Sequence, residues 1–214
     1  MNSLLSIWRS ELSEKNFKVI LISTILVLII VLTSLSNFLT YNDTLSGVAY
    51  VDPILKYFKP IDVTWITFLL IYAGLLIGLT ILTRHPKHLI IALQSYSLMA
   101  LFRIIVMYSL PLDPVPDTIP LEDPLVQLFG TGEILMRDLF FSGHTSTMFL
   151  LCLTSPKKLF RRIFLVLTIL VGLAVLVQHA HYTVDVLAAP FFAYTSYRVI
   201  KILNQKFNLI SLEK

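Results

Sequence analysis

Charged residues are scarce in this chain of 214 residues. Asp, Glu, Lys and Arg together make up 14% of the sequence, whereas about 25% is usual for a soluble domain. Hydrophobic residues make up 56%. This composition excludes an ordinary soluble domain and predicts an integral membrane protein.

Cysteine is scarcer still. The single cysteine, Cys152, cannot form an internal disulfide, so it indicates no redox compartment. A nucleic-acid-binding module is also missing, and the net charge of +4 comes from basic residues at the ends of apolar segments, where orienting charges are expected. A cleavable signal peptide is not predicted, because the first apolar run, residues 19–38, exceeds the ~7–15 residues of a signal sequence and lacks a small-x-small cleavage site.

Six apolar segments predict six transmembrane helices. Each is close to the ~20 residues that an α-helix needs to cross about 30 Å of hydrocarbon. We expect one all-α domain over residues 1–214, in which residues 1–16 form a short interfacial helix with Trp8 as an aromatic anchor. The expected spans are residues 18–39, 62–83, 87–110, 139–154, 160–178 and 183–203.

Two of these spans carry residues that predict how they pack. In the second, Gly74 and Gly78 form a small-xxx-small pattern, which favours close packing within the bundle over a dimer interface. In the sixth, Pro190 is expected to bend the helix, as membrane helices tolerate when neighbours satisfy the freed carbonyl.

The basic residues predict the orientation. If the N-terminus lies in the cytoplasm, most of the 17 Lys and Arg residues fall on the cytoplasmic side. The outer side keeps Lys56, Lys59, Arg103 and Arg137. By the positive-inside rule, both termini are expected in the cytoplasm.

Polar residues of the last four spans converge on the outer side in this topology. At 1.5 Å per residue, Arg103 lies roughly 10 Å below the outer end of the third span, and as a cation it suits a phosphate. His144 reaches a similar depth on the fourth span. The fifth span ends near His179 and His181, and Asp185 follows one turn into the sixth. A charged group costs about 2.5–3.5 kcal/mol at mid-bilayer, so these residues are candidates for function.

These residue types suit the transfer of a phosphate group. On a helix, His181 and Asp185 at i, i+4 lie on one face, so the carboxylate can orient the imidazole as a nucleophile. His144, on a separate helix, can protonate a leaving oxygen. Ser142 and the backbone at Gly143 can donate hydrogen bonds to an oxyanion.

The motifs resemble those of the sphingomyelin synthase family, a branch of the type 2 phosphatidic acid phosphatase superfamily. Residues 142–145 read Ser-Gly-His-Thr, with Asp138 four residues before the serine, and residues 181–186 read His-Tyr-Thr-Val-Asp-Val. The third-span segment that contains Arg103 is also similar. The resemblance covers roughly residues 96–200.

The resemblance implies a role for each residue. His181 would be the nucleophile that takes the phospho-headgroup in a phosphohistidine-type intermediate, Asp185 would orient it, and His144 would protonate the departing lipid alcohol. A second lipid alcohol, or water, would then resolve the intermediate, with no metal or cofactor. The residues expected to bind substrate or phosphate are Arg103, Asp138, Ser142, Gly143, His179 and Tyr182.

The chain departs from the family pattern at three places. Met136-Arg137 stands where the family usually has Cys-Gly, Pro190 replaces a tyrosine, and Tyr197 replaces a phenylalanine. The catalytic positions are all present. The departures bear on the headgroup and the acceptor, which the sequence does not identify.

Several of these residues also have structural interpretations. Asp138 suits an N-cap of the fourth helix. The three histidines and Tyr182 can serve packing, and Arg137 can be a loop charge. The acidic loop 111–124 is more consistent with a solvated loop than with a lid over the site.

Other classes of function stay open. A metal enzyme would use His144, His179, His181 and Asp185, which suit zinc or iron. A phospholipid transporter would need no catalytic histidine. The favoured prediction is an enzyme in the lipid bilayer that moves a phospho-headgroup from a phospholipid to ceramide or diacylglycerol at the outer leaflet. Hydrolysis of the same bond by water is the alternative.

Overall fold

The computed structural model describes residues 3–121, 135–210 and 212, and within these ranges the chain is helical, with no strand. One isolated bridge pairs Val48 with Leu112. The all-α class predicted from the sequence is therefore confirmed. The elements are α1 (Leu4–Ser13), α2 (Lys15–Asp43), the 3-10 turn η1 (Leu55–Tyr57), α3 (Thr64–Thr83), α4 (Pro86–Ser109), α6 (Gly143–Thr154), α7 (Lys158–Val177) and α8 (Thr183–Lys206).

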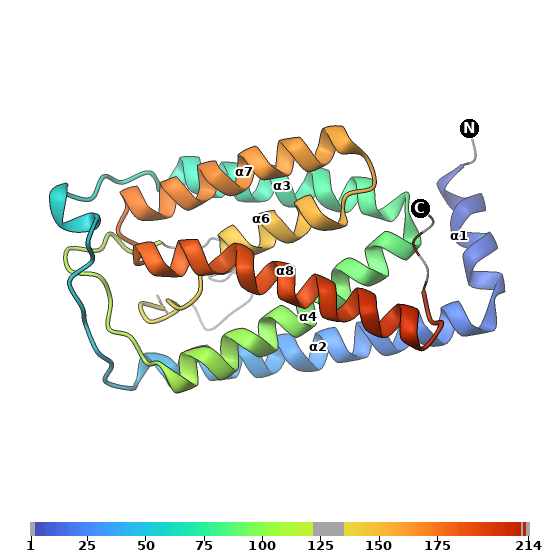
Figure 1. Cartoon of the computed structure of the whole chain (residues 1–214), viewed down its shortest axis with the longest axis horizontal. Coiled ribbons are helices and arrows are strands. Elements are labelled where there is room, and N and C mark those ends of the chain that lie inside the picture. Colours follow the sequence, from blue (N-terminus) through green and yellow to red (C-terminus); the bar gives the residue numbers. More distant parts are fainter. Residues whose placement is uncertain (1–2, 122–134, 211, 213–214) are drawn as a thin grey trace.

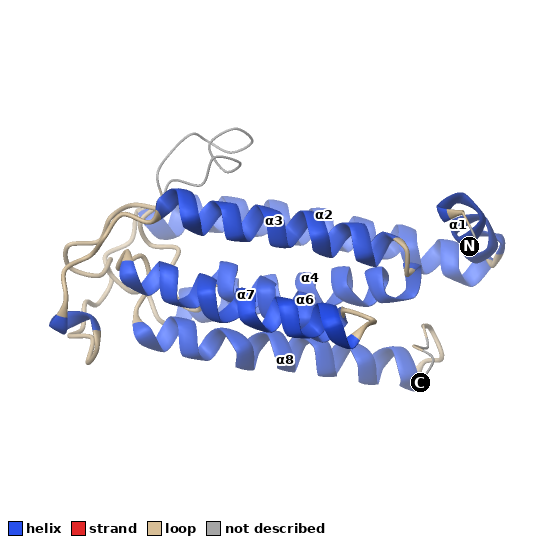
Figure 2. Cartoon of the chain, turned by 90° about the horizontal axis from the view of Figure 1, so that it is seen from above, coloured by secondary structure: helices blue, strands red, loops and turns tan. Residues whose placement is uncertain are grey.

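The helices from α2 to α8 form one bundle along the long axis of the molecule (Figure 1). Among the described helices, α2, α3, α4, α7 and α8 are long and apolar enough to cross a membrane. The chain is therefore built as a multi-pass membrane protein, while the predicted count of six spans is not confirmed. Both termini lie at the end of the bundle where α4 begins and α8 ends (Figures 1 and 2).

The expected fourth span is the exception. Its helix, α6, has 12 residues and is about 18 Å long, which is too short to cross a bilayer. Residues 139–142, predicted to be its first turn, precede the helix, and Ser142 is its N-cap residue. Figure 1 shows α6 starting inside the bundle, short of the end where α7 stops and α8 begins.

The segment before α6 is apolar for a reason other than helix formation. Leu139 and Phe141 are buried, and the ring of Phe141 stacks on that of Phe192 at 4.2 Å between centroids. Non-helical backbone at membrane depth is tolerated where protein surrounds it. These residues are apolar because they are buried in the protein. Hydropathy alone cannot distinguish such a segment from part of a transmembrane helix.

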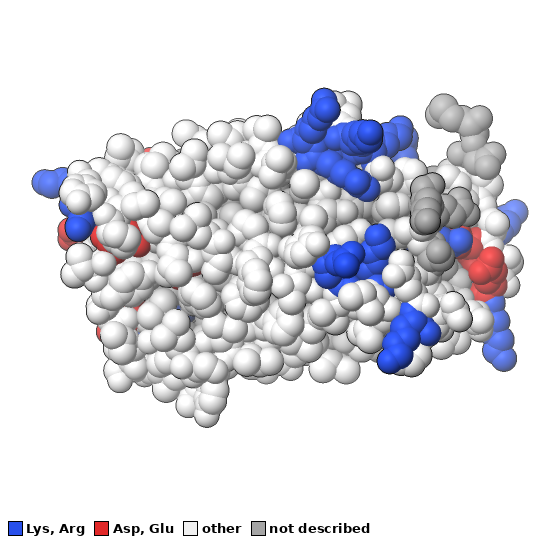
Figure 3. Space-filling model, viewed as in Figure 1, with Lys and Arg blue, Asp and Glu red and all other residues white. Residues whose placement is uncertain are grey.

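Charge is distributed unevenly along the bundle. On the face seen in Figure 3, Lys and Arg side chains gather where α7 begins and α8 ends. At the same end, α1 docks on the turn between α3 and α4, where the Trp8 indole N–H donates to the carbonyl of Thr83 (2.8 Å) and Lys87 lies 3.8 Å from Glu11. The position of α1 in a membrane interface stays a prediction.

The two glycines of α3 allow close helix packing inside the bundle, as predicted. A Cβ atom at Gly74 would lie 2.7 Å from Sδ of Met148 on α6, and one at Gly78 would lie 2.8 Å from a Cδ atom of Leu151. Contacts below about 3 Å require a neighbour to move. The small residues therefore set the distance between α3 and α6.

We expect Gly74→Leu to lower the thermal unfolding midpoint of the protein in detergent, because overpacking a filled core costs about 1–3 kcal/mol. Ala73→Leu is the matched control, since the neighbouring residue Ala73 is exposed on the lipid-facing side of α3. Equal midpoints for the two variants would contradict close packing at Gly74.

Candidate functional site

Arg103 on α4 is the buried cation of the candidate site. Its side chain pairs with the carboxylate of Asp138, and the residue is 9% exposed. A Cβ atom at Gly143 would lie 1.8 Å from Nη1 of Arg103, so the guanidinium lies directly against the first residue of α6. Asp138 is therefore an ion-pair partner of Arg103. Its predicted alternative role as the N-cap of that helix is wrong, because Ser142 is the N-cap residue.

The starts of α6 and α8 are joined by a backbone hydrogen bond. The N–H of Ser142 donates to the carbonyl of Asp185 (3.2 Å). Oγ of Ser142 is 3.0 Å from Oγ1 of Thr145, and the Ser142 side chain is fully buried. The Ser142 hydroxyl thus closes the first turn of α6. Its predicted role as a phosphate donor gains no support from this arrangement.

His181 and Asp185 lie close together, but they do not share the face of one helix as predicted. His181 precedes α8, whose N-cap residue is Tyr182. Nδ1 of His181 is 3.4 Å from Oδ2 of Asp185, in ion-pair contact without hydrogen-bond alignment. The same Oδ2 accepts the backbone N–H of Tyr182 (3.0 Å). Asp185 therefore caps α8 and faces His181 at once.

His144, the second residue of α6, lines a cavity of about 520 Å³. The ring of His144 contacts that of Phe68 edge-on, at 6.3 Å between centroids. Arg103, Asp138 and Gly143 line the same cavity, whose remaining walls are mostly aliphatic side chains of α2, α3, α4 and α6. This cavity combines a polar end with a long apolar body.

Five of the predicted site residues do not line this cavity, and Ser142, described above, is one of them. His181 is 4% exposed and is not among the lining residues. The other three are His179, Tyr182 and Asp185, all buried. His144 therefore lines the cavity, whereas His181 is buried beside the start of α8.

His179 packs against two loops, one that contains Phe58 and one that contains Pro116 and Thr118. It has a left-handed backbone (φ 57°), and its ring meets Phe58 edge-on at 5.1 Å between centroids. Nδ1 of His179 is 3.5 Å from the carbonyl of Pro116, and its own carbonyl accepts the hydroxyl of Thr118. These contacts favour a packing role for His179.

Tyr182 and the unpredicted residue Tyr50 form a stacked pair next to Asp185. Their rings are 4.1 Å apart and nearly parallel, and the Tyr182 hydroxyl donates to the carbonyl of Asp113 (3.0 Å). Burial raises the pKa of Tyr50 above its ordinary value, and the nearby carboxylates of Asp185 and Asp52 raise that pKa further. Both tyrosines are therefore neutral phenols beside the start of α8.

Asp52, also unpredicted, holds the start of α8 from the loop after α2. Its carboxylate accepts the backbone N–H and the hydroxyl of Thr183, at 2.7 and 2.8 Å. It also accepts the N–H groups of Ile54 and Leu55. Burial by itself would raise the pKa of Asp52, but these hydrogen bonds outweigh burial and hold the pKa below its ordinary value. Asp52 is thus a carboxylate that caps α8 from outside.

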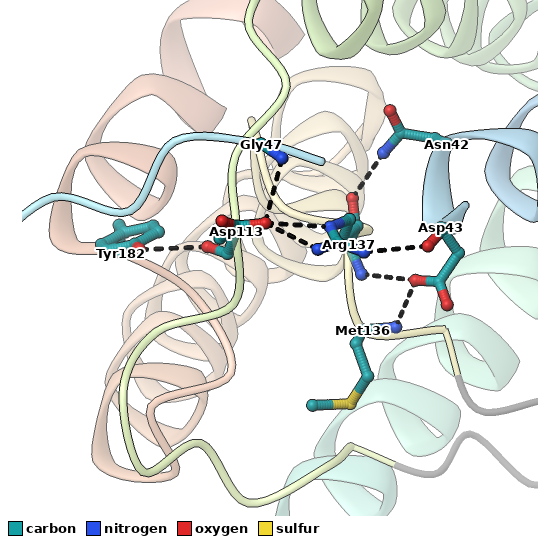
Figure 4. A network of polar contacts seen from close by, with 7 residues as sticks. All are labelled: Asn42, Asp43, Gly47, Asp113, Met136, Arg137 and Tyr182. Atoms are coloured by element: carbon teal, nitrogen blue, oxygen red, sulfur yellow. Dashed lines mark hydrogen bonds and ion pairs between the residues drawn. The ribbon is translucent and has the colours of Figure 1, made fainter. Parts of the chain in front are cut away.

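Arg137 is the centre of a hydrogen-bond network that joins the end of α2, the loop at Asp113 and the segment before α6 (Figure 4). Its Nε and Nη2 donate to Oδ1 of Asp113 at 3.2 and 2.7 Å, and its Nη1 donates to the carbonyl of Asp43 at 2.9 Å. Oδ1 of Asp43 accepts the backbone N–H of Met136 and of Arg137. Asn42 donates to the carbonyl of Arg137.

This network corrects two predictions. Arg137 is not a free loop charge, and Asp113 is not simply a solvated loop residue. Through the Tyr182 hydroxyl, the network also reaches the residue before α8. Two other acids of the loop, Glu122 and Asp123, lie outside the described residues.

The acidic residues whose partners the sequence analysis missed share one feature. Asp43, Asp52 and Asp113 have partners far away in sequence: 131 residues separate Asp52 from Thr183. Local periodicity carries no information on such pairs. The one available signal was the presence of several acids beside apolar spans, where an unpaired charge is costly.

The structure gives no support to a metal centre. That hypothesis required His144, His179, His181 and Asp185 to share an ion. Over the described part of the chain, no group of three or more His, Cys, Asp or Glu residues is arranged to hold one.

We expect Arg137→Met to lower the thermal unfolding midpoint by roughly 2–4 °C, because it removes three hydrogen bonds that hold the outer segments together. Arg162→Met is the control, since Arg162 is exposed on α7. An unchanged midpoint for Arg137→Met would show that the network does not stabilise the fold.

The pH dependence of the same variant tests the mechanism. Hydrogen bonds from Arg137, and one from Gly47, hold the pKa of Asp113 below its ordinary value. A lowered folded-state pKa stabilises the protein above the unfolded-state pKa of about 3.9, and this stability is lost as the pH falls through the folded-state pKa. The midpoint of Arg137→Met should therefore fall less on acidification than that of the unmodified protein.

Comparison with known proteins finds a family and a protein that resemble part of the chain. Residues 137–202 match the model of the family described as PAP2 superfamily C-terminal. The phosphatidylinositol:ceramide inositolphosphotransferase of Trypanosoma cruzi (strain CL Brener) is 29% identical over 123 residues, which cover 50% of this chain and 37% of that protein.

No solved structure matches the chain. The chain covers well under two thirds of the length of this relative. The matched segment nevertheless contains both motifs, from Asp138 through Asp185. The predicted resemblance to the sphingomyelin synthase-like family of the PAP2 superfamily is thus confirmed for this segment.

Proposed function

We propose that this protein is a lipid phosphotransferase that moves a phospho-headgroup from a phospholipid to a lipid alcohol. The observation that carries the proposal is the joined start of α6 and α8. The Ser142–Asp185 hydrogen bond holds together two helix starts, one bearing His144 and the other bearing His181 with Asp185. Helix N-termini bind anions favourably, so we expect a phosphate group to bind where these two helix starts meet.

The cavity suits a lipid substrate. Its apolar walls, which include Leu32 and Leu75, can take acyl chains, and its polar end carries Arg103 and His144. Nε of Arg103 is buried and lacks a hydrogen-bond partner, so an N–H donor remains for a phosphate oxygen beside the ion pair with Asp138. A donor phospholipid would lie with its phosphate at Arg103 and its chains along α2 and α3.

The proposed reaction has two steps. Nε2 of His181 attacks the phosphorus, the bond from phosphorus to the oxygen of the diacylglycerol alcohol breaks, and protonated His144 gives its proton to that oxygen. Asp185 accepts the Nδ1–H of His181 and stabilises the imidazole as it gains positive charge. In the second step, neutral His144 takes the proton of an acceptor hydroxyl, whose oxygen attacks phosphorus, and the bond from phosphorus to His181 breaks.

This reaction requires a more open arrangement than the one observed. His181 is buried and does not line the cavity. The residues that cover it must therefore move before the phosphorus can reach Nε2. In such an arrangement, the 3.4 Å contact between Nδ1 of His181 and Oδ2 of Asp185 can shorten into a hydrogen bond. Catalytic hydrogen bonds commonly tighten in this way when substrate binds.

Ceramide and diacylglycerol are the proposed acceptors, by analogy with the matched relative, whose name specifies ceramide. Water as the acceptor would make the protein a lipid phosphate hydrolase. The proposed orientation puts both termini in the cytoplasm and the site toward the outer leaflet. It is supported by the basic residues at the end of the bundle where the termini lie.

The purified protein, incubated with a labelled phospholipid donor, should form a new phospholipid only when ceramide or diacylglycerol is added, as detected by mass spectrometry. His181→Ala should abolish the product, and His144→Ala should slow its formation by about 10²–10⁴-fold. His85→Ala is the matched control, because His85 stands at the opposite end, before α4.

The other outcomes are also informative. Free phosphate or phospho-alcohol released without an acceptor would identify a hydrolase. Full activity in His181→Ala would refute the mechanism. If the unmodified protein and His181→Ala were both inactive on a broad panel of lipids, the proposal that this protein is an enzyme would be wrong.

Gly143→Ala should lower kcat/KM by about 10²-fold, measured at a temperature at which the variant remains folded. The added methyl would lie 1.8 Å from Nη1 of Arg103, and the flexible arginine would move away from Asp138 and from the phosphate. Misplacing a binding group by about 1 Å can cost this much activity. Normal kcat/KM would show that the guanidinium is not positioned for the substrate.

A further inference from the structure

A second hollow lies between α2, α4 and α8, on the half of the bundle where α4 begins and α8 ends. Its volume is about 320 Å³, and it shares no lining residue with the larger cavity. We refer to it as the α2–α4–α8 groove. Its lining residues are Ser23, Thr24, Val27, Gln94, Ser97, Leu98, Leu101, Ile200, Leu203, Asn204 and Leu209.

A chain of amide hydrogen bonds forms the polar floor of this groove. Nδ2 of Asn204 donates to Oε1 of Gln94 (2.8 Å) and to the carbonyl of Ile200 (2.9 Å). Nε2 of Gln94 then donates to Oγ1 of Thr24 (3.1 Å). The floor thus links one residue from each of the three helices.

This chain of hydrogen bonds leaves one buried acceptor unpaired. Asn204 is 3% exposed, and its Oδ1 has no hydrogen-bond partner. An unpaired buried carbonyl costs about 1–3 kcal/mol, and apolar surroundings offer little to replace the missing donor. A ligand that brings one donor to this point gains that energy.

The walls of the groove indicate what kind of ligand would donate a hydrogen bond to Asn204. Val27, Leu101 and Leu203 line the groove and are exposed on the outer surface of the bundle, where lipid surrounds a membrane protein. Among the described residues that line the groove, none is charged. A phosphate would find no cation there, whereas a neutral hydroxyl on an apolar body matches both the floor and the walls.

We propose that the α2–α4–α8 groove binds a lipid alcohol, meaning a neutral membrane lipid with a free hydroxyl on an apolar body. The hydroxyl donates to Oδ1 of Asn204, and the apolar body lies along Val27, Leu98 and Leu101. Sterols, diacylglycerol and ceramide share this chemistry. The site is separate from the candidate catalytic site and does not depend on the proposed reaction.

Photolabelling of the full-length protein in lipid nanodiscs tests the proposal. The probes are a sterol, a diacylglycerol and a ceramide, each bearing a diazirine and an alkyne, and each paired with its O-methyl ether. At least one free alcohol should label the peptide containing residues 200–209, none of which lines the larger cavity, and its ether should label that peptide about fivefold less, because the ether cannot donate to Asn204. This comparison uses the unmodified protein, so it does not depend on how a variant folds.

Val27→Trp should fill the groove and reduce labelling of the same peptide to a similar extent. Ile30→Trp is the matched control, because Ile30 lies one turn further along α2, is 65% exposed compared with 49% for Val27, and lines neither hollow. Labelling of residues 139–151 reports the larger cavity and should persist in Val27→Trp. A failed catalytic proposal and a failed groove proposal are therefore distinguishable.

The probe that labels the groove identifies the source of the hydroxyl. Equal labelling by alcohols and ethers, or unchanged labelling in Val27→Trp, would overturn the proposal. Cross-linking of two protein copies through Val27 in place of lipid labelling would also overturn it, and would assign the groove to an interface between copies of the chain.

Discussion

The burial of Arg103 is the constraint on which the candidate site depends. A guanidinium in an apolar bundle is costly unless it is paired, and here Asp138 supplies the charge while Gly143 supplies the space. Both partners come from the chain around the start of α6. The ion pair therefore favours a helix that begins inside the bundle, preceded by a buried non-helical segment, over a helix that crosses the whole membrane.

The recessed start of α6 needs support from outside the bundle. The residues before it are held by Asp43 through the backbone of Met136 and Arg137. Arg137 then connects to Asp113, whose carbonyl accepts the hydroxyl of Tyr182 just before α8. These loops thus act as a frame that holds the starts of α6 and α8 close to each other.

Hydropathy predicted the long helices closely: the third span, expected at 87–110, is α4 at Pro86–Ser109. It failed for α6, because residues 139–142 are apolar through burial and not through helix formation. The sequence also identified Arg103, Asp138 and His144 as candidate site residues, and the three line one cavity. It could not identify Asp52 or Asp113 as partners of Thr183 and Arg137, because those pairs arise from packing between distant segments.

The His181–Asp185 pair shows how a correct spacing can have a different structural cause. On a helix, residues four apart share a face, but His181 lies before α8, and the contact forms across the helix start. Asp185 at the third position of α8 caps the backbone of Tyr182 with the same oxygen that faces His181. Capping fixes this carboxylate without using a second side chain. A four-residue spacing at a helix start can therefore place a carboxylate beside a histidine, and the frame of loops keeps that start in place.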